Sequence, residues 1–160
     1  MIFMNETERL NAEEVCGRLH GERNMKAIVI ERPNELRLRE LPVPVPAADE
    51  VLVKVAYCGV CGTDVHIYHG DKGSADVNPP VILGHEFSGV VEKIGSAVTS
   101  LHVGDHVTVD PNIYCGKCRP CRQGQKQMCH HMKAVGVTMD GGFADYCLVP
   151  HAQCVAVPQG

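Results

Sequence analysis

The chain has 160 residues and a mass of 17.4 kDa, which suits a single domain, since domains cluster at about 100 to 150 residues. Fifteen basic and nineteen acidic residues give a net charge of −4, which argues against a general affinity for nucleic acid or anionic membranes. No apolar run approaches the 18 or so residues of a membrane span, and no signal peptide is visible, so we expect a soluble, cytoplasmic protein. Nine Cys without a secretion signal favour metal ligation over disulfides.

Residues 1–24 are more charged than the residues after them and precede an apolar pattern that starts abruptly at Met25. They could form a short helix or an unstructured extension. We expect the extension, because terminal residues ahead of a clean strand start are commonly disordered. Cys16, within this segment, is expected to be a free thiol.

From Met25 onward the pattern is typical of β-strands. A second stretch carries Leu36, Leu38 and Leu41, and a Pro-rich run after it predicts a turn or an edge connection. Many short strands between turn residues predict a barrel or sandwich rather than a parallel α/β sheet. The best helix candidate is Thr63 to Gly70, with Thr63 as a possible N-cap. The remaining predicted strands are Lys26–Ile30, Glu50–Tyr57, Glu86–Ile94, Asp105–Val109, Phe143–Val149 and Cys154–Val157.

The strongest local signal is a C-x2-C-x2-C-x7-C spacing. Zn²⁺ prefers a tetrahedron of soft ligands, and four thiolates leave no open position, so the spacing predicts a structural zinc site. Four reduced thiols are the alternative, but apolar cysteines would not be strung along a polar, Gly-rich segment. The ferredoxin-type spacing does not fit, because the last gap is too long. The four residues are Cys115, Cys118, Cys121 and Cys129.

The segment around these cysteines is basic. It has no acidic residue between Pro111 and Lys133. Four thiolates on one Zn²⁺ carry a formal charge of about −2, and the cations can offset it. These cations are Lys117, Arg119, Arg122, Lys126 and Lys133.

A second candidate site is divided between residues 58–70 and 84–86. A catalytic zinc needs about three protein ligands and one vacant position, and Cys61, His85 and Glu86 offer a thiolate, an imidazole and a carboxylate. Asp64 can accept the other ring N–H of His85 and fix its tautomer. Spacing alone leaves open that these residues are simply packed in a β-rich core.

Thr63 and His66 lie three residues apart, on the same face of the predicted short helix. A hydroxyl followed by an imidazole suits a proton relay from a substrate alcohol through Thr63 to His66 and on to solvent. The two residues are therefore candidate catalytic residues, together with Asp64.

Five motifs in order resemble the N-terminal catalytic domain of the zinc-containing medium-chain dehydrogenases. They are C-G-T-D-x-H-x-Y, G-H-E-F-S-G-x-V, G-D-H-V, the four-cysteine segment and G-G-F-A-D-Y. The resemblance covers residues 25–160 and implies a mainly β, GroES-like, partly open β-barrel, with a lobe at 112–133 that binds the structural zinc.

The resemblance also implies roles for individual residues. The family's zinc-binding Cys stands immediately before G-T-D, which selects Cys61 over Cys58, and Glu86 binds the metal directly or through water. Thr63 and His66 match the relay positions, and Asp64 matches the carboxylate beside the ligand His. Cys58, Cys147 and Cys154 match no ligand position, and we expect them to be small buried residues.

Relatives in this family continue into a helix with a further zinc ligand and then a Rossmann domain that binds NAD or NADP. No G-x-G-x-x-G fingerprint follows a strand in this sequence, so a Rossmann domain and cofactor-binding residues are expected to be absent. The resemblance therefore implies the catalytic-domain portion of a zinc-dependent dehydrogenase, inactive alone. The full-length form is expected to be a homo-oligomer.

The expected substrate is an alcohol or polyol of the sorbitol or L-iditol type, oxidised from a secondary alcohol to a ketone, because Glu86 and the segment 110–121 resemble that branch. L-threonine 3-dehydrogenase, or another zinc alcohol dehydrogenase, is the alternative. A further alternative is a non-enzymatic zinc module whose basic lobe contacts nucleic acid or protein, although the net charge and the lack of interleaved aromatics count against it. An exposed apolar barrel face could also favour self-association.

Overall fold

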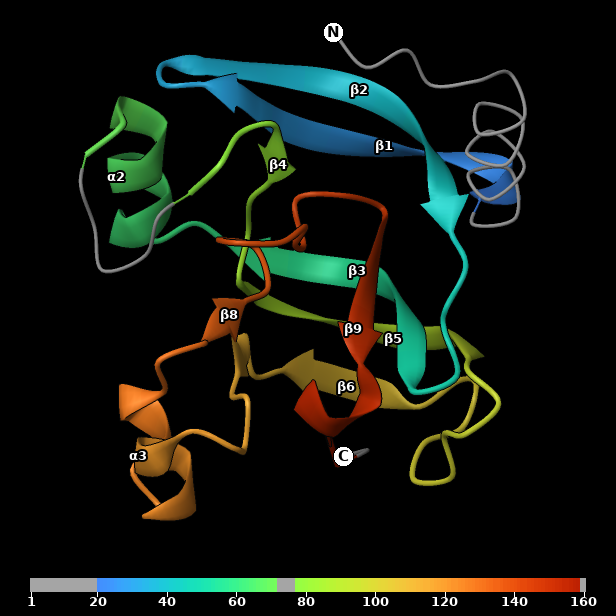
Figure 1. Cartoon of the computed structure of the whole chain (residues 1–160). Coiled ribbons are helices and arrows are strands. Elements are labelled where there is room, and N and C mark those ends of the chain that lie inside the picture. Colours follow the sequence, from blue (N-terminus) through green and yellow to red (C-terminus); the bar gives the residue numbers. More distant parts are fainter. Residues whose placement is uncertain (1–19, 72–76, 159–160) are drawn as a thin grey trace, which may run out of the picture.

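The computed structural model describes residues 20–71 and 77–158, and of residues 20–22 only the backbone. Two antiparallel sheets form the body, and a small lobe projects from one end (Figure 1). In the described residues, no helix has the length and apolar character needed to cross a membrane.

The first sheet has the strand order β2-β1-β4. A hairpin joins β1 (His20–Arg32) to β2 (Glu35–Pro44), with Asn34 at φ 64° in its turn, and β4 (Val81–Ile82) pairs with the other side of β1. Strand β2 lies at the sheet edge, where its prolines cost no ladder hydrogen bonds, as the Pro-rich run predicts.

The second sheet has the order β10-β6-β5-β3-β9 and carries most of the core. Its two outer strands do not pair with each other in the described residues, so the predicted partly open barrel is confirmed as an open one. The strands are β3 (Glu50–Gly59), β5 (Glu86–Ile94), β6 (His106–Val109), β9 (Tyr146–Pro150) and β10 (Cys154–Ala156).

The remaining elements are short. Helix α2 (Gly62–His69) follows β3, and the 3-10 turn η2 (His151–Gln153) precedes β10. The lobe begins and ends at the two-stranded sheet of β7 (Asn112–Ile113) and β8 (Lys133–Ala134), which encloses α3 (Arg119–Arg122) and the 3-10 turn η1 (Lys126–Met128).

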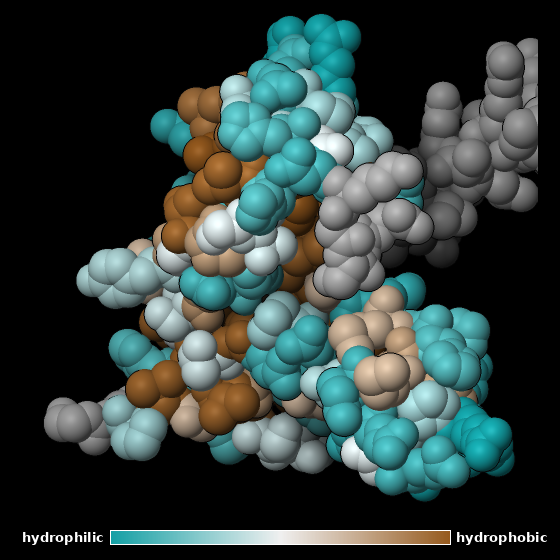
Figure 2. Space-filling view, turned by 90° about the vertical axis from the view of Figure 1, so that its left-hand side faces the viewer, coloured by the Kyte–Doolittle hydropathy of each residue, from teal (hydrophilic) through white to brown (hydrophobic). Residues whose placement is uncertain are grey.

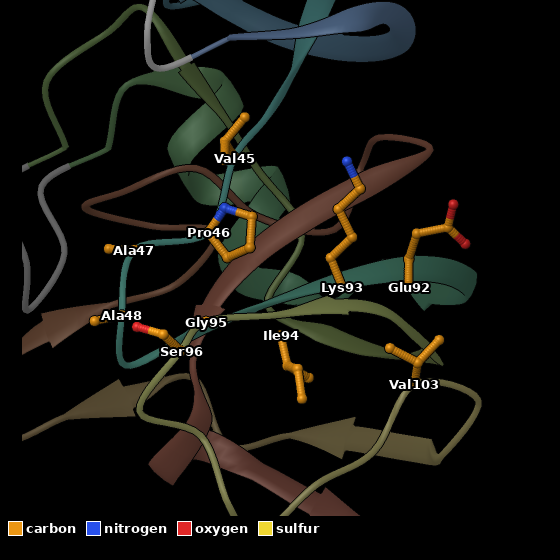
Figure 3. A pocket seen from close by; sticks show the side chains of 10 residues that line it. All are labelled: Val45, Pro46, Ala47, Ala48, Glu92, Lys93, Ile94, Gly95, Ser96 and Val103. Atoms are coloured by element: carbon orange, nitrogen blue, oxygen red, sulfur yellow. The ribbon is translucent and has the colours of Figure 1, made fainter.

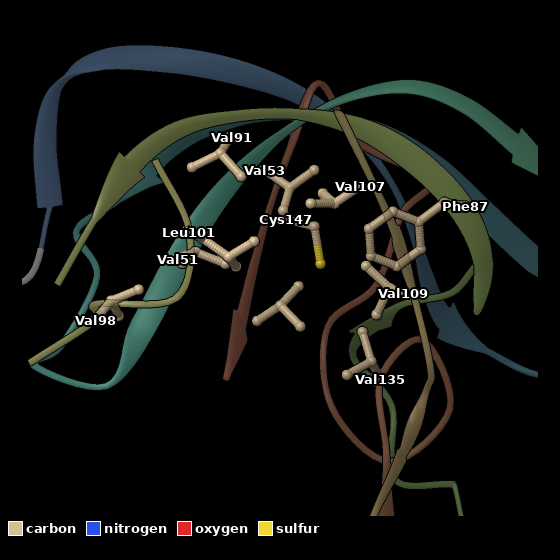
Figure 4. Packing of buried hydrophobic residues seen from close by; sticks show 11 residues of the cluster. Val51, Val53, Phe87, Val91, Val98, Leu101, Val107, Val109, Val135 and Cys147 are labelled. Atoms are coloured by element: carbon tan, nitrogen blue, oxygen red, sulfur yellow. The ribbon is translucent and has the colours of Figure 1, made fainter. Parts of the chain in front are cut away.

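The first half of β3 is buried on both faces, because this strand lies inside the larger sheet. Val51 and Val53 point into a cluster of apolar side chains that also contains Phe87, Val107 and Cys147 (Figure 4). On the other face, Leu52 packs with Met25, Val29 and Ile82 of the smaller sheet. Burying such side chains contributes roughly 1.5–3 kcal/mol each, so these two clusters hold the sheets together.

The predicted strands are largely confirmed. The bounds of β5 are those expected, and β3, β6 and β10 differ from expectation by two residues or fewer. Strand β1 begins at His20, five residues before Met25, because β2 extends to Pro44 and supplies a partner for His20. Strand β9 begins at Tyr146 rather than Phe143, because the preceding residues bond to β1 and to the 82–84 segment instead. Residues 1–19, the larger part of the predicted extension, lie outside the described residues.

Candidate metal centres

Helix α2 begins at Gly62 with Cys61 as its N-cap, whereas Thr63 was the predicted N-cap. The Cys61 sulfur accepts a hydrogen bond from the Thr63 backbone N–H at 3.3 Å, and the Asp64 carboxylate accepts one from the Cys61 N–H at 2.9 Å. This reciprocal capping box satisfies two free donors of the first turn. It places the Cys61 sulfur and the Asp64 carboxylate together at the start of the helix. The helix ends at Gly70 in the left-handed conformation, as expected for a glycine C-cap.

His85 precedes the first residue of β5 and is brought to the same place from the other side. Its Nε2 atom lies 3.2 Å from the Cys61 sulfur, and its Nδ1 atom lies 3.5 Å from Oδ1 of Asp64. The side chains of His85 and Asp64 are 13% and 5% exposed. The structure thus brings together three residues that are up to 24 positions apart in the sequence.

The Asp64 and His85 side chains each have one buried polar atom that is not hydrogen-bonded within the described part of the chain. These atoms are Oδ1 of Asp64 and Nδ1 of His85. A proton on Nδ1 directed at Asp64 leaves the Nε2 lone pair facing the Cys61 sulfur, which is the tautomer a metal requires. One thiolate and one imidazole pointing at a common position are a donor set that suits Zn²⁺.

Glu86 completes the cluster, because ligand atoms of Cys61, His85 and Glu86 all lie within 4.8 Å of one another. The Glu86 carboxylate is exposed and lies over Gly59, where an added Cβ would come within 3.3 Å of Oε2. The three side chains predicted to form the second metal site therefore converge.

The two predicted relay residues lie on α2 and are exposed. The structure places no hydrogen bond between Thr63 and His66 within its described residues. His66 Nδ1 instead lies 2.9 Å from Oδ2 of Asp71, just past the helix end. Asp71 was not among the residues predicted from the sequence, although an acid five residues after a candidate relay His is a signal that could have identified it.

The four cysteines of the lobe also converge, with all four sulfur atoms within 4.8 Å of one another. Backbone N–H groups point at the sulfurs: the Cys115 and His131 N–H groups lie 3.3 and 3.4 Å from the Cys129 sulfur. The Cys118 N–H lies 3.4 Å from the Cys115 sulfur. Such a nest of donors stabilises negative charge on the sulfurs, as a metal–thiolate cluster requires.

The same contacts separate the thiol pKa values. Backbone N–H groups of Cys121 and His130 lower the pKa of Cys118 to about 6. Hydrogen bonding from the Cys115 backbone lowers the pKa of Cys129. Desolvation, followed by its hydrogen bond with Cys118, raises the pKa of Cys121 to about 12. Without a cation, the Cys118 thiolate therefore lies in one cluster with the Cys121 thiol, and Zn²⁺ is the kind of ion that would allow all four cysteines to be ionised.

The other three described cysteines differ in burial. Cys147 is buried as expected, whereas Cys58 and Cys154 are only half-buried and pack against the edge of the core. Burial raises the pKa of Cys58 and of Cys154 to about 11, so both are protonated thiols near neutral pH.

Two cavities lie along β5. One of about 480 Å³ adjoins the Cys61 cluster, and its lining includes His85 and Glu86 with the hydroxyl-bearing side chains of Tyr57, Ser88 and Thr108. A second, of about 530 Å³, lies at the opposite end of β5 around Ile94 and contains none of the predicted site residues (Figure 3). The smaller cavity is the one that belongs to the candidate site, because its lining contains the predicted ligands His85 and Glu86.

Comparison with known proteins identifies the family. Residues 47–159 match the model of the alcohol dehydrogenase GroES-like domain. The chain belongs to this family. An L-threonine 3-dehydrogenase from Rhizobium etli is 41% identical over 136 residues, which are 84% of this chain and 39% of the relative. A D-xylulose reductase A from Aspergillus oryzae is 41% identical over 136 residues, 83% of this chain and 38% of the relative.

A solved structure of a similar protein also matches this chain in fold and sequence. The crystal structure of a zinc-binding dehydrogenase from Sinorhizobium meliloti, bound to NADP, superposes with a TM-score of 0.81 at 44% identity. The match covers 86% of this chain and 39% of that protein. This GroES-like chain therefore spans about two fifths of the length of the relatives that it matches.

Proposed function

We propose that this chain is the zinc-binding catalytic portion of an NAD- or NADP-dependent dehydrogenase that oxidises a secondary alcohol to a ketone. The observation that carries the proposal is the convergence of Cys61, His85 and Glu86 beside the buried Asp64 carboxylate. Residues that only fill a core would not need a buried carboxylate next to an imidazole, because such a group costs free energy unless it serves a partner.

We propose two zinc sites with different tasks. The four cysteines of the lobe hold a structural ion, because they occupy every position of a tetrahedron. Cys61 and His85 hold the catalytic ion, with Glu86 binding directly or through water. When bound there, zinc supplies Lewis-acid chemistry, which lowers the pKa of the substrate hydroxyl. Asp64 holds the proton of His85 on Nδ1 and so fixes the ring for binding through Nε2.

Thr63 and His66 are the proposed path for the hydroxyl proton. Both lie on the exposed first turns of α2, and the Thr63 N–H is anchored on the Cys61 sulfur, which keeps its side chain next to the site. His66 is oriented by Asp71 at 2.9 Å and faces solvent, so a proton that reaches its ring can leave to water. In the complete reaction the alcohol gives a hydride to NAD(P)⁺ and this proton to solvent, forming the ketone and NAD(P)H.

The cofactor is proposed from the relatives, because the solved Sinorhizobium meliloti relative binds NADP. No dinucleotide fingerprint lies in this sequence. The residues that bind the nicotinamide cofactor therefore belong to a part of the protein that corresponds to the remainder of these relatives. We also propose the homo-oligomeric state for that longer form.

A polyol is the proposed substrate class. The similarity to D-xylulose reductase A supports it, as do the Tyr57, Ser88 and Thr108 hydroxyls in the cavity next to Glu86, which can bind the further hydroxyl groups of such a molecule. L-threonine is the second candidate, since the Rhizobium etli enzyme with that name is equally 41% identical.

The test joins this chain to the remaining part of the Sinorhizobium meliloti relative, with which it shares 44% identity. The fusion should contain two zinc ions per chain and reduce NAD⁺ or NADP⁺ with sorbitol or xylitol faster than with L-threonine. The same fusion carrying Cys61→Ser is the matched control and should be inactive. A fusion that holds two zinc ions and oxidises none of these compounds would contradict the proposed substrate class. Activity that survives Cys61→Ser would contradict the proposed site.

A further inference from the structure

The segment 136–143 contains the start of the G-G-F-A-D-Y motif and contributes no side chain to either metal centre. It nevertheless lies along the residues that lead to His85. The backbone N–H groups of Gly141, Gly142 and Phe143 donate to the carbonyls of Ile82, Gly84 and Leu83 at 2.9, 2.7 and 2.9 Å, respectively. We call residues 136–143 the glycine clasp.

The clasp also holds Ile82 through a side chain. Oδ1 of Asp140 accepts a hydrogen bond from the Ile82 N–H at 2.9 Å. Every residue from Ile82 to Gly84 is thus tied to the clasp, and His85 is the next residue along the chain. The position of the His85 backbone is therefore set by a segment more than fifty residues away in the sequence.

Two clasp glycines leave no room for a side chain against this segment. A Cβ on Gly141 would lie 2.3 Å from the Gly84 carbonyl oxygen. A Cβ on Gly136 would lie 2.2 Å from the same oxygen and 2.8 Å from the His85 backbone nitrogen. Real Cβ atoms essentially never come closer than 3.0 Å to another atom, so either side chain would require the clasp and the Gly84–His85 peptide to move apart by about 0.7 to 0.8 Å.

Gly84 itself also leaves no room for a side chain. Its φ of +92° favours glycine, and an added Cβ would come within 2.6 Å of the Phe143 ring and 2.8 Å of the Cys58 sulfur. The peptide before His85 is therefore packed tightly between Phe143 of the clasp and Cys58 of β3. A displacement would be passed on to His85.

We propose that Gly136 and Gly141 are positioning residues for the metal ligand His85. This inference rests on the proposed function, because it takes Cys61 and His85 as ligands of one zinc ion. Metal–ligand distances are held within about 0.2 Å and working sites within about 0.5 Å, and a shift of about 0.7 to 0.8 Å exceeds both tolerances. The clasp glycines keep Nε2 of His85 opposite the Cys61 sulfur without touching the metal themselves.

The test compares Gly141→Ala with Gly95→Ala in the 160-residue chain, with zinc in the lobe and Co²⁺ titrated into the second site. Gly141 does not have a positive φ, so its variant introduces only the steric contact. Gly95 follows the other end of β5, and a Cβ there would lie 1.9 Å from the Ala47 carbonyl oxygen, an equivalent clash far from His85. Gly141→Ala should weaken Co²⁺ binding about 10- to 100-fold, measured by thiolate-to-cobalt absorption, whereas Gly95→Ala should not.

A second measurement does not depend on the second metal. The NMR resonances of the His85 ring and amide, in the chain with zinc in the lobe alone, should shift in Gly141→Ala and stay in place in Gly95→Ala. If Gly141→Ala does not fold, Asp140→Ala replaces it, because it removes one hydrogen bond to Ile82 without a clash. It should weaken Co²⁺ binding about fivefold and also shift the His85 resonances.

The outcomes distinguish a failure of the positioning role from a failure of the proposed zinc site. Unchanged His85 resonances and unchanged Co²⁺ affinity in the folded variant would overturn the positioning role, as would an equal loss in Gly95→Ala. A wild-type chain that binds no second metal contradicts the proposed zinc site instead, and the His85 resonances then decide the positioning role by themselves.

Discussion

Nδ1 of His85 lies 3.5 Å from Oδ1 of Asp64, and both atoms are buried. Asp64 is the one charged residue in the described part of the chain that is fully buried, at 4% exposure. A buried carboxylate is costly unless it is paired, so its position beside the ring identifies the pair as a unit that orients the imidazole.

Asp64→Asn should therefore weaken metal binding at the second site. The amide keeps the size of the side chain and an acceptor for the Cys61 N–H, but it removes the charge that favours a proton on Nδ1 of His85. We expect the Co²⁺ affinity of this site to fall about 10- to 100-fold, measured by titration. Asp105→Asn, which alters an exposed loop acid that caps the His102 N–H, is the control and should have no effect. Equal affinities for all three proteins would refute the role of Asp64.

Cys61→Ser and His85→Ala should each abolish the second site and leave the lobe intact. Metal analysis of the zinc-supplemented chain should give close to two ions for the wild type and one for either variant. Cys58→Ser is a matched control, because Cys58 is three residues away and its raised pKa, near 11, keeps it protonated. The assignment of Cys61 fails if Cys58→Ser is the variant that loses the metal.

Cys118→Ser should destabilise the lobe. It removes one of four ligands from a closed site and leaves three sulfurs close together without the ion that neutralises them. Losses of structural metals are among the largest single-residue effects, so we expect about 4 kcal/mol or more, seen as a lower thermal midpoint and aggregation. Cys154→Ser, a half-buried cysteine outside the lobe, is the control. Unchanged thermal stability in Cys118→Ser would show that the lobe does not need metal.

Zinc affinity of the lobe should rise with pH. Desolvation raises the pKa of Cys121 to about 12, so at neutral pH this thiol must lose its proton when the ion binds. Because its pKa is about 6, Cys118 is already a thiolate at pH 7. Only below about pH 6 must it also lose a proton when the ion binds. The apparent affinity should therefore increase at least about tenfold per pH unit near pH 7, and more steeply below pH 6. Titration with a competing chelator between pH 5.5 and 8.5 measures it, and a flat profile would contradict metal binding by these thiols.

Hydrophobic surface remains exposed on the described part of the molecule. The face with α2 shows brown, hydrophobic areas between hydrophilic ones (Figure 2). Tyr57 and Val60, which shortly precede Cys61 in the chain, are 80% and 71% exposed. Exposed apolar side chains of this kind next to a candidate site are typical of an interaction surface.

Much of this protein follows from local sequence. The four cysteines can be assigned to one site because their short spacing lets turns aim the sulfurs at one point, and the strands can be assigned because β-branched residues alternate between turn residues. The bounds of β5 and the one described helix of two turns were predictable for the same reason. These features depend on neighbours a few positions apart.

The second centre depends on the tertiary structure. Cys61 and His85 are separated by 24 residues, and only the capping box of α2, the start of β5 and the glycine clasp bring them to 3.2 Å. The tie between the clasp and Gly84 was not predictable, because it is a set of hydrogen bonds between segments more than fifty residues apart, whose geometry is set only after the chain has folded. Residue types and spacing limited the chemistry to zinc and thiolate. The packing of distant backbone segments decided which imidazole meets which sulfur, since a few tenths of an ångström in backbone position separate a metal ligand from a packed side chain.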